Sequence, residues 1–298
     1  MKNKEISKFP IPTLPGWRHY YDVYFYAGWR IQKNEIKETY RVLSSTGRTW
    51  KKKTEEECMA VIHERRERGL SPRNSHLIII VPGLNSVLST FSALEKGLKD
   101  RGYETLIWHF ASNRADTIEH AVRLAKLINR LEGVEKISFV AHSMGGLIIR
   151  ALLAKNHAWY KRFELGNIVN IASPHGGSFV ADLVSEQPQF SGLFDWVCGH
   201  AGYDLTTKGA KELPSVRVPI GIIIGGTGFK LGLNPLAGQD NDIVVSRDSV
   251  QIELAADFVQ VKGSHTLMLW SKETVNQTVY FLENGCFLHA NKSATLEQ

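Results

Sequence analysis

The sequence predicts an α/β fold, in which helices flank a mostly parallel sheet, with a small α+β extension at the N-terminus. From residue 76 onward, apolar runs alternate with amphipathic segments, as they do in βαβ units. The runs are apolar throughout, which is typical of strands buried on both faces of a sheet. Residues 18–70 show a different order, because aromatic-rich segments come first and one helical segment follows.

The N-terminal extension is predicted to contain strands and one helix. Three prolines before residue 17 indicate an extended lead-in. The segments 20–32 and 39–45 are rich in Tyr, Val, Phe and Trp, as strands are, and "STGRTW" after them predicts a turn. Residues 54–69 predict a helix with Thr54 as its cap and Gly69 as its stop.

Residues 76–298 form the larger predicted domain. Strands are expected at 76–81, 103–110, 136–141, 167–172, 218–226 and 257–263, and helices at 86–102, 116–133, 144–156 and 266–285. The connection 176–215 is longer than those that usually join a strand to the next element. It is therefore a candidate lid.

The composition is that of a globular protein, with 43% hydrophobic and 22% charged residues among 298. The net charge is +6, and residues 1–75 carry the whole excess, with 16 Lys and Arg against 9 Asp and Glu. The segment "RTWKKKTEEEC" places three lysines beside three acids. A solvated charged face is therefore expected there, rather than a nucleic-acid or membrane surface.

The sequence also bears on the compartment. No apolar run approaches the roughly 18 residues of a membrane span, and the basic N-terminus lacks the apolar core of a secretion signal. Cys58, Cys198 and Cys286 are far apart and odd in number, which argues against a disulfide framework or a zinc site. A cytoplasmic location is therefore expected.

The stretch "FVAHSMGGLIIRALLA" places Ser143 between an apolar strand and an apolar helix. Ala141 and Gly145 are small enough for the two backbones to meet in a strained turn. Such a turn exposes the hydroxyl above the carboxyl edge of the sheet, where α/β proteins bind ligands. Ser143 is the candidate nucleophile, and a serine that only caps a glycine-rich turn is the alternative.

A serine nucleophile needs a base, and the base needs an orienting acid, in the chain order serine, acid, histidine for this kind of turn. His265 follows a late apolar strand and opens the last predicted helix, so it is the candidate base. Asp240, Asp242 and Asp248 compete for the acid. Asp242 is favoured because the run "IVV" after it would anchor its loop, with Asp240 second; aspartates that only form turns are the alternative.

Two backbone amides are candidates for an oxyanion hole. Met144 begins a helix directly after the serine, so its amide would point at a developing oxyanion. The loop "VPGLNS" follows the first parallel strand, where Gly83 permits a tight turn and the amide of Leu84 would face the serine. An ordinary strand-to-helix turn accounts for this loop nearly as well.

The motifs "VPGLNS", "AHSMGG", "ASPHGGS", "NDIVV" and "GSH" occur in the order and spacing of the α/β-hydrolase superfamily. Residues 76–284 resemble small bacterial triacylglycerol lipases and related lipase-like serine esterases, which also carry Ala at the position of Ala141. One departure is Pro82, where those lipases usually have a histidine of mostly structural role. The resemblance implies a catalytic triad of Ser143, His265 and Asp242. It also implies an oxyanion hole formed by the amides of Leu84 and Met144.

Residues 179–200 form an apolar insertion, which is either a lid or wall for an acyl chain or a packed helical excursion. The candidates for substrate contact are Phe179, Phe190, Phe194 and Trp196. In "SPHGGS", His175 is expected to be a hydrogen-bonded structural histidine beside the pocket rather than a second base.

The expected activity is hydrolysis of a carboxylic ester, with a small or lipid ester as the binding partner and no nucleic acid. The mechanism needs no metal and no cofactor, and membrane association is not favoured. An acyltransferase or a thioesterase would use the same triad, whereas a binding module would keep the fold without catalysis.

Overall fold

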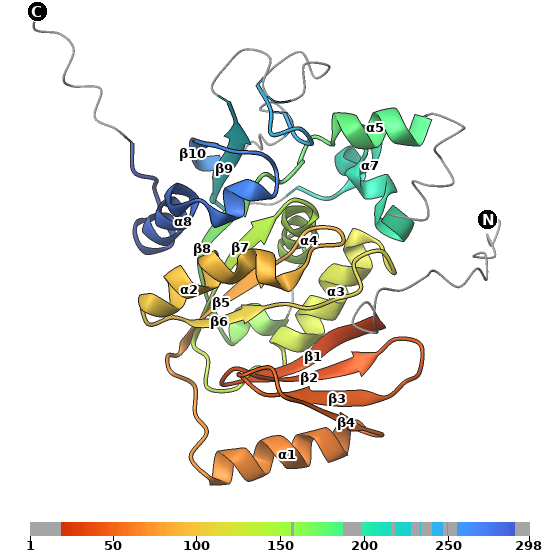
Figure 1. Ribbon diagram of the computed structural model, residues 1–298, viewed down its shortest axis with the longest axis vertical. Helices are drawn as coiled ribbons and strands as arrows, with labels where there is room; N and C mark the ends of the chain where they lie inside the picture. Colours follow the sequence, from red (N-terminus) through yellow and green to blue (C-terminus); the bar gives the residue numbers. More distant parts are fainter. Residues whose placement is uncertain are drawn as a thin grey trace, which may run out of the picture.

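The computed structural model describes residues 19–155, 158–186, 198–215, 218–227, 233, 240–246, 249 and 255–289. Its strands form a four-stranded antiparallel sheet near the N-terminus, sheet A, and a six-stranded parallel sheet, sheet B (Figure 1). Helices flank sheet B, so the predicted α/β fold with an N-terminal α+β extension is confirmed.

Sheet B has the strand order β10-β9-β8-β7-β5-β6, and all neighbours run parallel. Its strands are β5 (His76–Val81), β6 (Glu104–Ile107), β7 (Lys136–His142), β8 (Glu164–Ile171), β9 (Ile220–Gly226) and β10 (Ala255–Lys262). The chain runs outward from β5 to β6 and then returns to β7 on the other side of β5. The strand order therefore reverses between β5 and β7, which is where open α/β sheets bind ligands, at the carboxyl ends of the strands.

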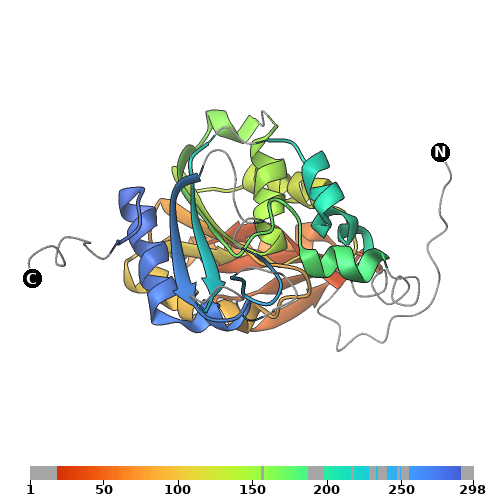
Figure 2. The same cartoon turned by 90° about the horizontal axis from the view of Figure 1, so that it is seen from above.

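Helices cover both faces of sheet B. α3 (Thr117–Ile128) and α4 (Met144–Leu153) pack on one face, and α2 (Ser92–Asp100) and α8 (Lys272–Asn284) on the other; Figure 2 shows α4 and α8 on opposite sides of β9 and β10. Alternate residues of β5 enter the two cores, because successive side chains of a strand point to opposite faces. This explains the continuous apolar run.

The long connection between β8 and β9 contains α5 (Phe179–Glu186), α7 (Thr207–Glu212) and short 3-10 turns. The Thr207 amide donates a 2.8 Å hydrogen bond to Asp182 and so joins α7 to α5. The 3-10 helices among the described residues are η2 (Leu88–Phe91), η3 (Ala158–Lys161), η4 (Gly199–Ala201), η5 (Tyr203–Leu205) and η8 (Leu267–Trp270). No helix in the described part of the chain is both long enough and apolar enough to cross a bilayer.

Sheet A contains β1 (Tyr20–Tyr26), β2 (Trp29–Asn34), β3 (Tyr40–Leu43) and β4 (Thr49–Lys52), in that order, and α1 (Glu55–Glu67) follows. Thr54 caps α1 as predicted, because its hydroxyl accepts a 3.3 Å hydrogen bond from the Glu57 amide. Tyr24 and Ile31 pack against α1, whereas Phe25 joins the core that contains α3. Sheet A therefore lies between α1 and α3 (Figure 1).

The predicted turn "STGRTW" is longer than the observed one. Thr49 and Trp50 already belong to β4, where they pair with Leu43 and Val42. Trp50 also stacks on Trp29, with ring centroids 5.6 Å apart. Contact with a strand distant in sequence therefore extends the pairing beyond what local turn propensity indicates.

The predicted strand at 103–110 ends earlier, at Ile107. Trp108 and Phe110 stack on each other with ring centroids 4.3 Å apart and fill the core beside His120. Their apolar character therefore reflects packing of the loop that follows β6 rather than pairing within the sheet.

Candidate active site

Ser143 lies where β7 ends and α4 begins, and its backbone is strained. Its φ of 53° and ψ of −127° are outside the regions that residues other than glycine normally adopt. The Ser143 amide donates to Ile171 O at 3.0 Å, and the Gly146 amide donates to Ser143 O at 3.0 Å. These bonds hold the turn, and Ser143 remains only half-buried.

Glycines allow this turn to form. A Cβ on Gly145 would lie 2.1 Å from the Val81 carbonyl oxygen, and one on Gly83 would lie 2.8 Å from the Ser143 Cβ. Real Cβ atoms do not approach other heavy atoms so closely, so any other residue would force the strands and helix apart. The close approach also places the loop after β5 directly beside Ser143.

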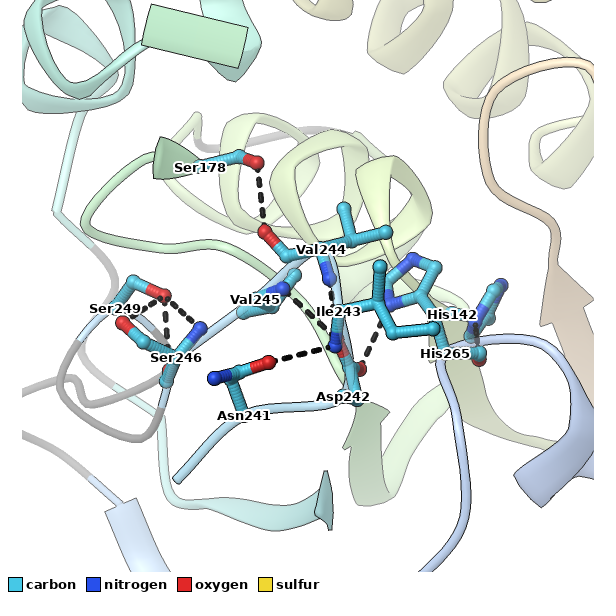
Figure 3. A network of polar contacts seen from close by, with 10 residues as sticks. All are labelled: His142, Ser178, Asn241, Asp242, Ile243, Val244, Val245, Ser246, Ser249 and His265. Atoms are coloured by element: carbon cyan, nitrogen blue, oxygen red, sulfur yellow. Dashed lines mark hydrogen bonds and ion pairs between the residues drawn. The ribbon is translucent and has the colours of Figure 1, made fainter. Parts of the chain in front are cut away.

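Asp242 and His265 meet above the same edge of sheet B (Figure 3). His265 Nδ1 lies 2.7 Å from Asp242 Oδ2, and the His265 amide donates to Asp242 O at 3.0 Å. The Asp242 side chain is 1% exposed and that of His265 13%. Because a carboxylate only accepts, His265 Nδ1 carries the proton and Nε2 is left able to accept one.

The loop around Asp242 is held by its own hydrogen bonds. Asp242 Oδ1 accepts from the amides of Val244 and Val245 at 3.0 and 2.8 Å. Ser178, at the start of α5, donates its hydroxyl to Val244 O at 2.8 Å (Figure 3). The carboxylate is therefore fixed from three directions, with Oδ2 aimed at His265.

The other two candidate acids are placed differently. The Asp240 carboxylate accepts from the Thr227 amide at 3.0 Å and from Gln260 Nε2, so it lies at the end of β9 and not beside His265. Asp248 lies outside the described residues.

His142 is a residue of the site that sequence reasoning missed. It is 4% exposed, and its Nε2 donates to His265 O at 2.9 Å (Figure 3). Burial, followed by the neighbouring His265, lowers the pKa of His142 to about 3. A neutral ring with its proton on Nε2 thus supports the backbone of His265. Its position next to Ser143 could have indicated a role in the site. However, a residue at the end of an apolar strand is also expected in the hydrophobic core.

The two amides proposed for the oxyanion hole belong to the residue after Ser143 and to the residue after Gly83. Met144 is the first residue of α4, where the helix N-terminus favours negative charge. Leu84 follows Gly83 in the loop that contacts the Ser143 side chain. Neither amide has a hydrogen-bond acceptor among the residues that the structure describes.

The predicted substrate contacts are only partly described. Phe179 begins α5 and is 39% exposed. The remaining candidates lie outside the described residues: Phe190, Phe194 and Trp196. His175 is buried, and its Nε2 accepts from Asn170 at 2.8 Å. Burial lowers its pKa to about 3, which is consistent with a structural histidine.

Exposed apolar side chains occur on the segments that carry the candidate site. The exposed ones come from the loop after β5, from the Asp242 loop and from η8, and they are Val87, Ile243, Leu267 and Trp270. Exposed apolar groups grouped around a polar centre are typical of a binding surface for an apolar ligand.

Comparison with known structures defines the class of the fold. The mature form of Bacillus licheniformis lipase BlEst2 superimposes with a TM-score of 0.55 at 19% identity, over 69% of this chain and 90% of that one. The propeptide form of the same lipase superimposes with a TM-score of 0.58 at 20% identity, over 74% of this chain and 52% of that one. The metagenomic carboxyl esterase MGS0156 gives 0.50 at 19% identity, over 64% of each chain. The protein therefore has the α/β-hydrolase fold.

Residues 71–185 match the family described as "Putative serine esterase (DUF676)". The matched segment spans the loop with Leu84, the Ser143 turn and most of α5. The resemblance to serine esterases of the α/β-hydrolase superfamily is thereby confirmed. No curated protein matches the chain.

Proposed function

We propose that this protein is a serine hydrolase that cleaves carboxylic esters. The observation that carries the proposal is the 2.7 Å contact between His265 Nδ1 and Asp242 Oδ2 at the sheet edge where Ser143 occupies its strained turn. The similarity of residues 71–185 to a serine esterase family supports it.

In the proposed reaction, Ser143 Oγ attacks the ester carbonyl carbon while His265 Nε2 takes the hydroxyl proton. The amides of Leu84 and Met144 donate hydrogen bonds to the oxyanion. The C–O bond then breaks, the alcohol leaves with the proton from His265, and the acyl group stays on Ser143. Water attacks this acyl-enzyme by the same route and releases the acid. Asp242 keeps the imidazole oriented and stabilises its charged form.

We further propose that residues 76–298 are the catalytic unit, that 176–215 include a lid, and that the substrate carries an acyl chain of medium length or longer. The exposed side chains of Phe179, Ile243 and Leu267 support the last point, because burying apolar surface favours longer chains by about 0.8 kcal/mol per CH₂ group.

Ser143→Ala tests the activity. Ester turnover should fall by about 10⁴-fold or more, with an unchanged fold, because the variant lacks only the nucleophile. The measurement is hydrolysis of p-nitrophenyl esters, with labelling by a fluorophosphonate as a second readout. Near-normal turnover by a pure Ser143→Ala preparation would disprove the assignment.

The same panel, from acetate to palmitate, tests chain-length preference. We expect kcat/KM to rise from acetate to octanoate. A steady fall would mean that these exposed apolar side chains do not bind the acyl chain. A parallel assay with acyl thioesters and with added alcohols distinguishes the esterase from a thioesterase and an acyltransferase.

A further inference from the structure

Residues 108–113, which follow β6, contact both sheet A and the loop after β5. We propose that sheet A positions the Leu84 amide for oxyanion binding through this loop. The positioning residues are Asp22, Gln32 and Ser112. The proposal rests on the ester hydrolase activity proposed above and adds a role for the N-terminal extension in that activity.

Asp22 of β1 clamps the start of the loop. Its carboxylate Oδ2 accepts from the His109 amide at 2.7 Å, and its own amide donates to His109 O at 2.8 Å. Asp22 is 1% exposed. Both backbone groups of His109 are thus bound to one residue of sheet A, which fixes the direction in which the chain leaves β6.

Gln32 of β2 lies opposite Asp22 in the strand register and completes the clamp. Its Nε2 donates to Asp22 Oδ1 at 2.7 Å and to His109 Nδ1 at 2.9 Å, and its Oε1 accepts from Arg41 at 2.8 Å. Burial, with Arg30 and Arg41, lowers the pKa of His109 to about 3. Because the NH₂ group of Gln32 can only donate, Nδ1 of the neutral His109 ring is the acceptor in this contact.

Ser112, three residues after His109, joins this loop to the loop after β5. Its Oγ accepts from the Asn85 amide at 2.8 Å. Its carbonyl oxygen accepts from Nε2 of the buried His120 at 3.2 Å. Asn85 has a φ of 51°. The bond to Ser112 thus fixes the peptide that links Leu84 to Asn85, on the carboxyl side of the proposed oxyanion donor.

The two loops lie against each other with a small cavity of about 20 Å³ between them. The first loop contributes Pro82, Gly83, Asn85, Ser86 and Leu88, and the second contributes Trp108 to Asn113. Gly83 lies so close to Ser143 that a Cβ built on it would be 2.8 Å from the Ser143 Cβ. A continuous path of hydrogen bonds and packing therefore runs from sheet A to the side of Ser143 where the oxyanion would form.

Loss of an oxyanion donor costs about 10² to 10³ in kcat. Displacing a donor should cost less than removing it, so we expect a loss of about tenfold when this path is broken. KM should change little, because the oxyanion forms only in the transition state.

The variants that test the path are Asp22→Asn, Ser112→Ala and their combination. Ser112→Thr, which retains a hydroxyl, tests for rescue. Tyr24→Phe is the matched control: Tyr24 lies on the same strand and its hydroxyl donates to Glu132 at 2.8 Å, away from the loop. Two readouts are used, kcat and KM for p-nitrophenyl butyrate, and hydrogen exchange in a peptide covering 83–88.

We expect Asp22→Asn and Ser112→Ala each to lower kcat about tenfold with an unchanged KM, and to speed exchange in 83–88. The double variant should be no worse than the poorer single one, because both changes break one path. Ser112→Thr should restore kcat, and Tyr24→Phe should change neither readout.

Unchanged exchange in 83–88 for Asp22→Asn would overturn the proposal, and so would additive losses of kcat in the double variant. A wild-type protein that hydrolyses no ester would contradict the proposed function instead. The exchange measurement still decides whether sheet A controls this loop, since it does not depend on turnover.

Discussion

At the scale of single residues, backbone strain gathers around the candidate active site. Ser143 has a φ of 53°, and the β-branched Ile243 has a φ of 93°. Such conformations cost about 1–3 kcal/mol each. Asn241 Oδ1 accepts from the Ile243 amide at 2.9 Å and helps to hold it. The strained turn at Ile243 lets the neighbouring carboxylate of Asp242 face away from solvent toward His265.

Asp242 and Asp240 are the described candidates for the acid that orients His265, and substitutions distinguish them. Asp242→Asn should lower kcat by about 10³ to 10⁴-fold, because an amide group in place of Oδ2 no longer holds His265 with its proton on Nδ1. Asp240→Asn is the matched control, since the Asp240 carboxylate contacts Thr227 and Gln260 instead. Its kcat should stay within about tenfold of wild type.

The measurement is steady-state hydrolysis of p-nitrophenyl butyrate by both variants, with their melting temperatures. A large loss of kcat in Asp240→Asn alone would move the acid to Asp240 and leave Ser143 and His265 in their proposed roles.

At the scale of elements, sheet A supplies one wall of the core around α3. Phe25 packs into that core, Arg130 donates to Val23 O at 3.2 Å, and Asp22 is buried against the loop after β6. Deleting residues 1–72 would therefore expose apolar and hydrogen-bonding groups together. We expect the truncated chain to be insoluble or to melt at least about 10 °C lower than the full chain.

The truncated and full chains are compared by soluble yield and thermal unfolding. Binding of the full chain to anionic vesicles is measured at low and high salt, since recruitment by basic residues would be salt-sensitive. We expect weak binding, because only Thr54 separates Lys51, Lys52 and Lys53 from three consecutive acids. A soluble, fully active truncation, together with tight, salt-sensitive binding of the full chain, would contradict a scaffold role.

At the scale of the whole molecule, stability should depend on pH through four histidines that are buried in the described part of the chain. Burial is the main cause that lowers the pKa from 6.5 to about 3 in His109, His142 and His175 and to about 4 in His120. Below pH 6.5 the unfolded chain binds protons that the folded one does not. The free energy of unfolding should therefore fall from pH 6.5 toward pH 4, by up to about 1.4 kcal/mol per pH unit for each histidine.

Urea unfolding between pH 7.5 and 4.5 measures this dependence. His120→Gln should reduce the slope by about one proton. A free energy of unfolding that stays constant between pH 6.5 and 4.5 would mean that these histidines are charged in the folded protein.

The sequence alone determined those features that depend on residues close together in the chain. The apolar runs of β5 and β7 and the cap at Thr54 depend on residues next to each other in the chain. The turn at Ser143 depends on the small residues two positions away on either side, since only they let a strand and a helix meet so closely. Periodicity and sterics act over a few residues, so the sequence displays them directly.

The tertiary structure alone decided the contacts between distant residues. Asp242 reaches His265 and Asp240 does not, although both lie in one short loop, because Asp240 binds Thr227 and Gln260. The support that His142 gives to His265, across 123 positions of the chain, has no local signature. The same is true of the Asp22 carboxylate, which meets the His109 amide 87 positions away. Such contacts form only when packing brings separate elements together, and no neighbouring residues encode them.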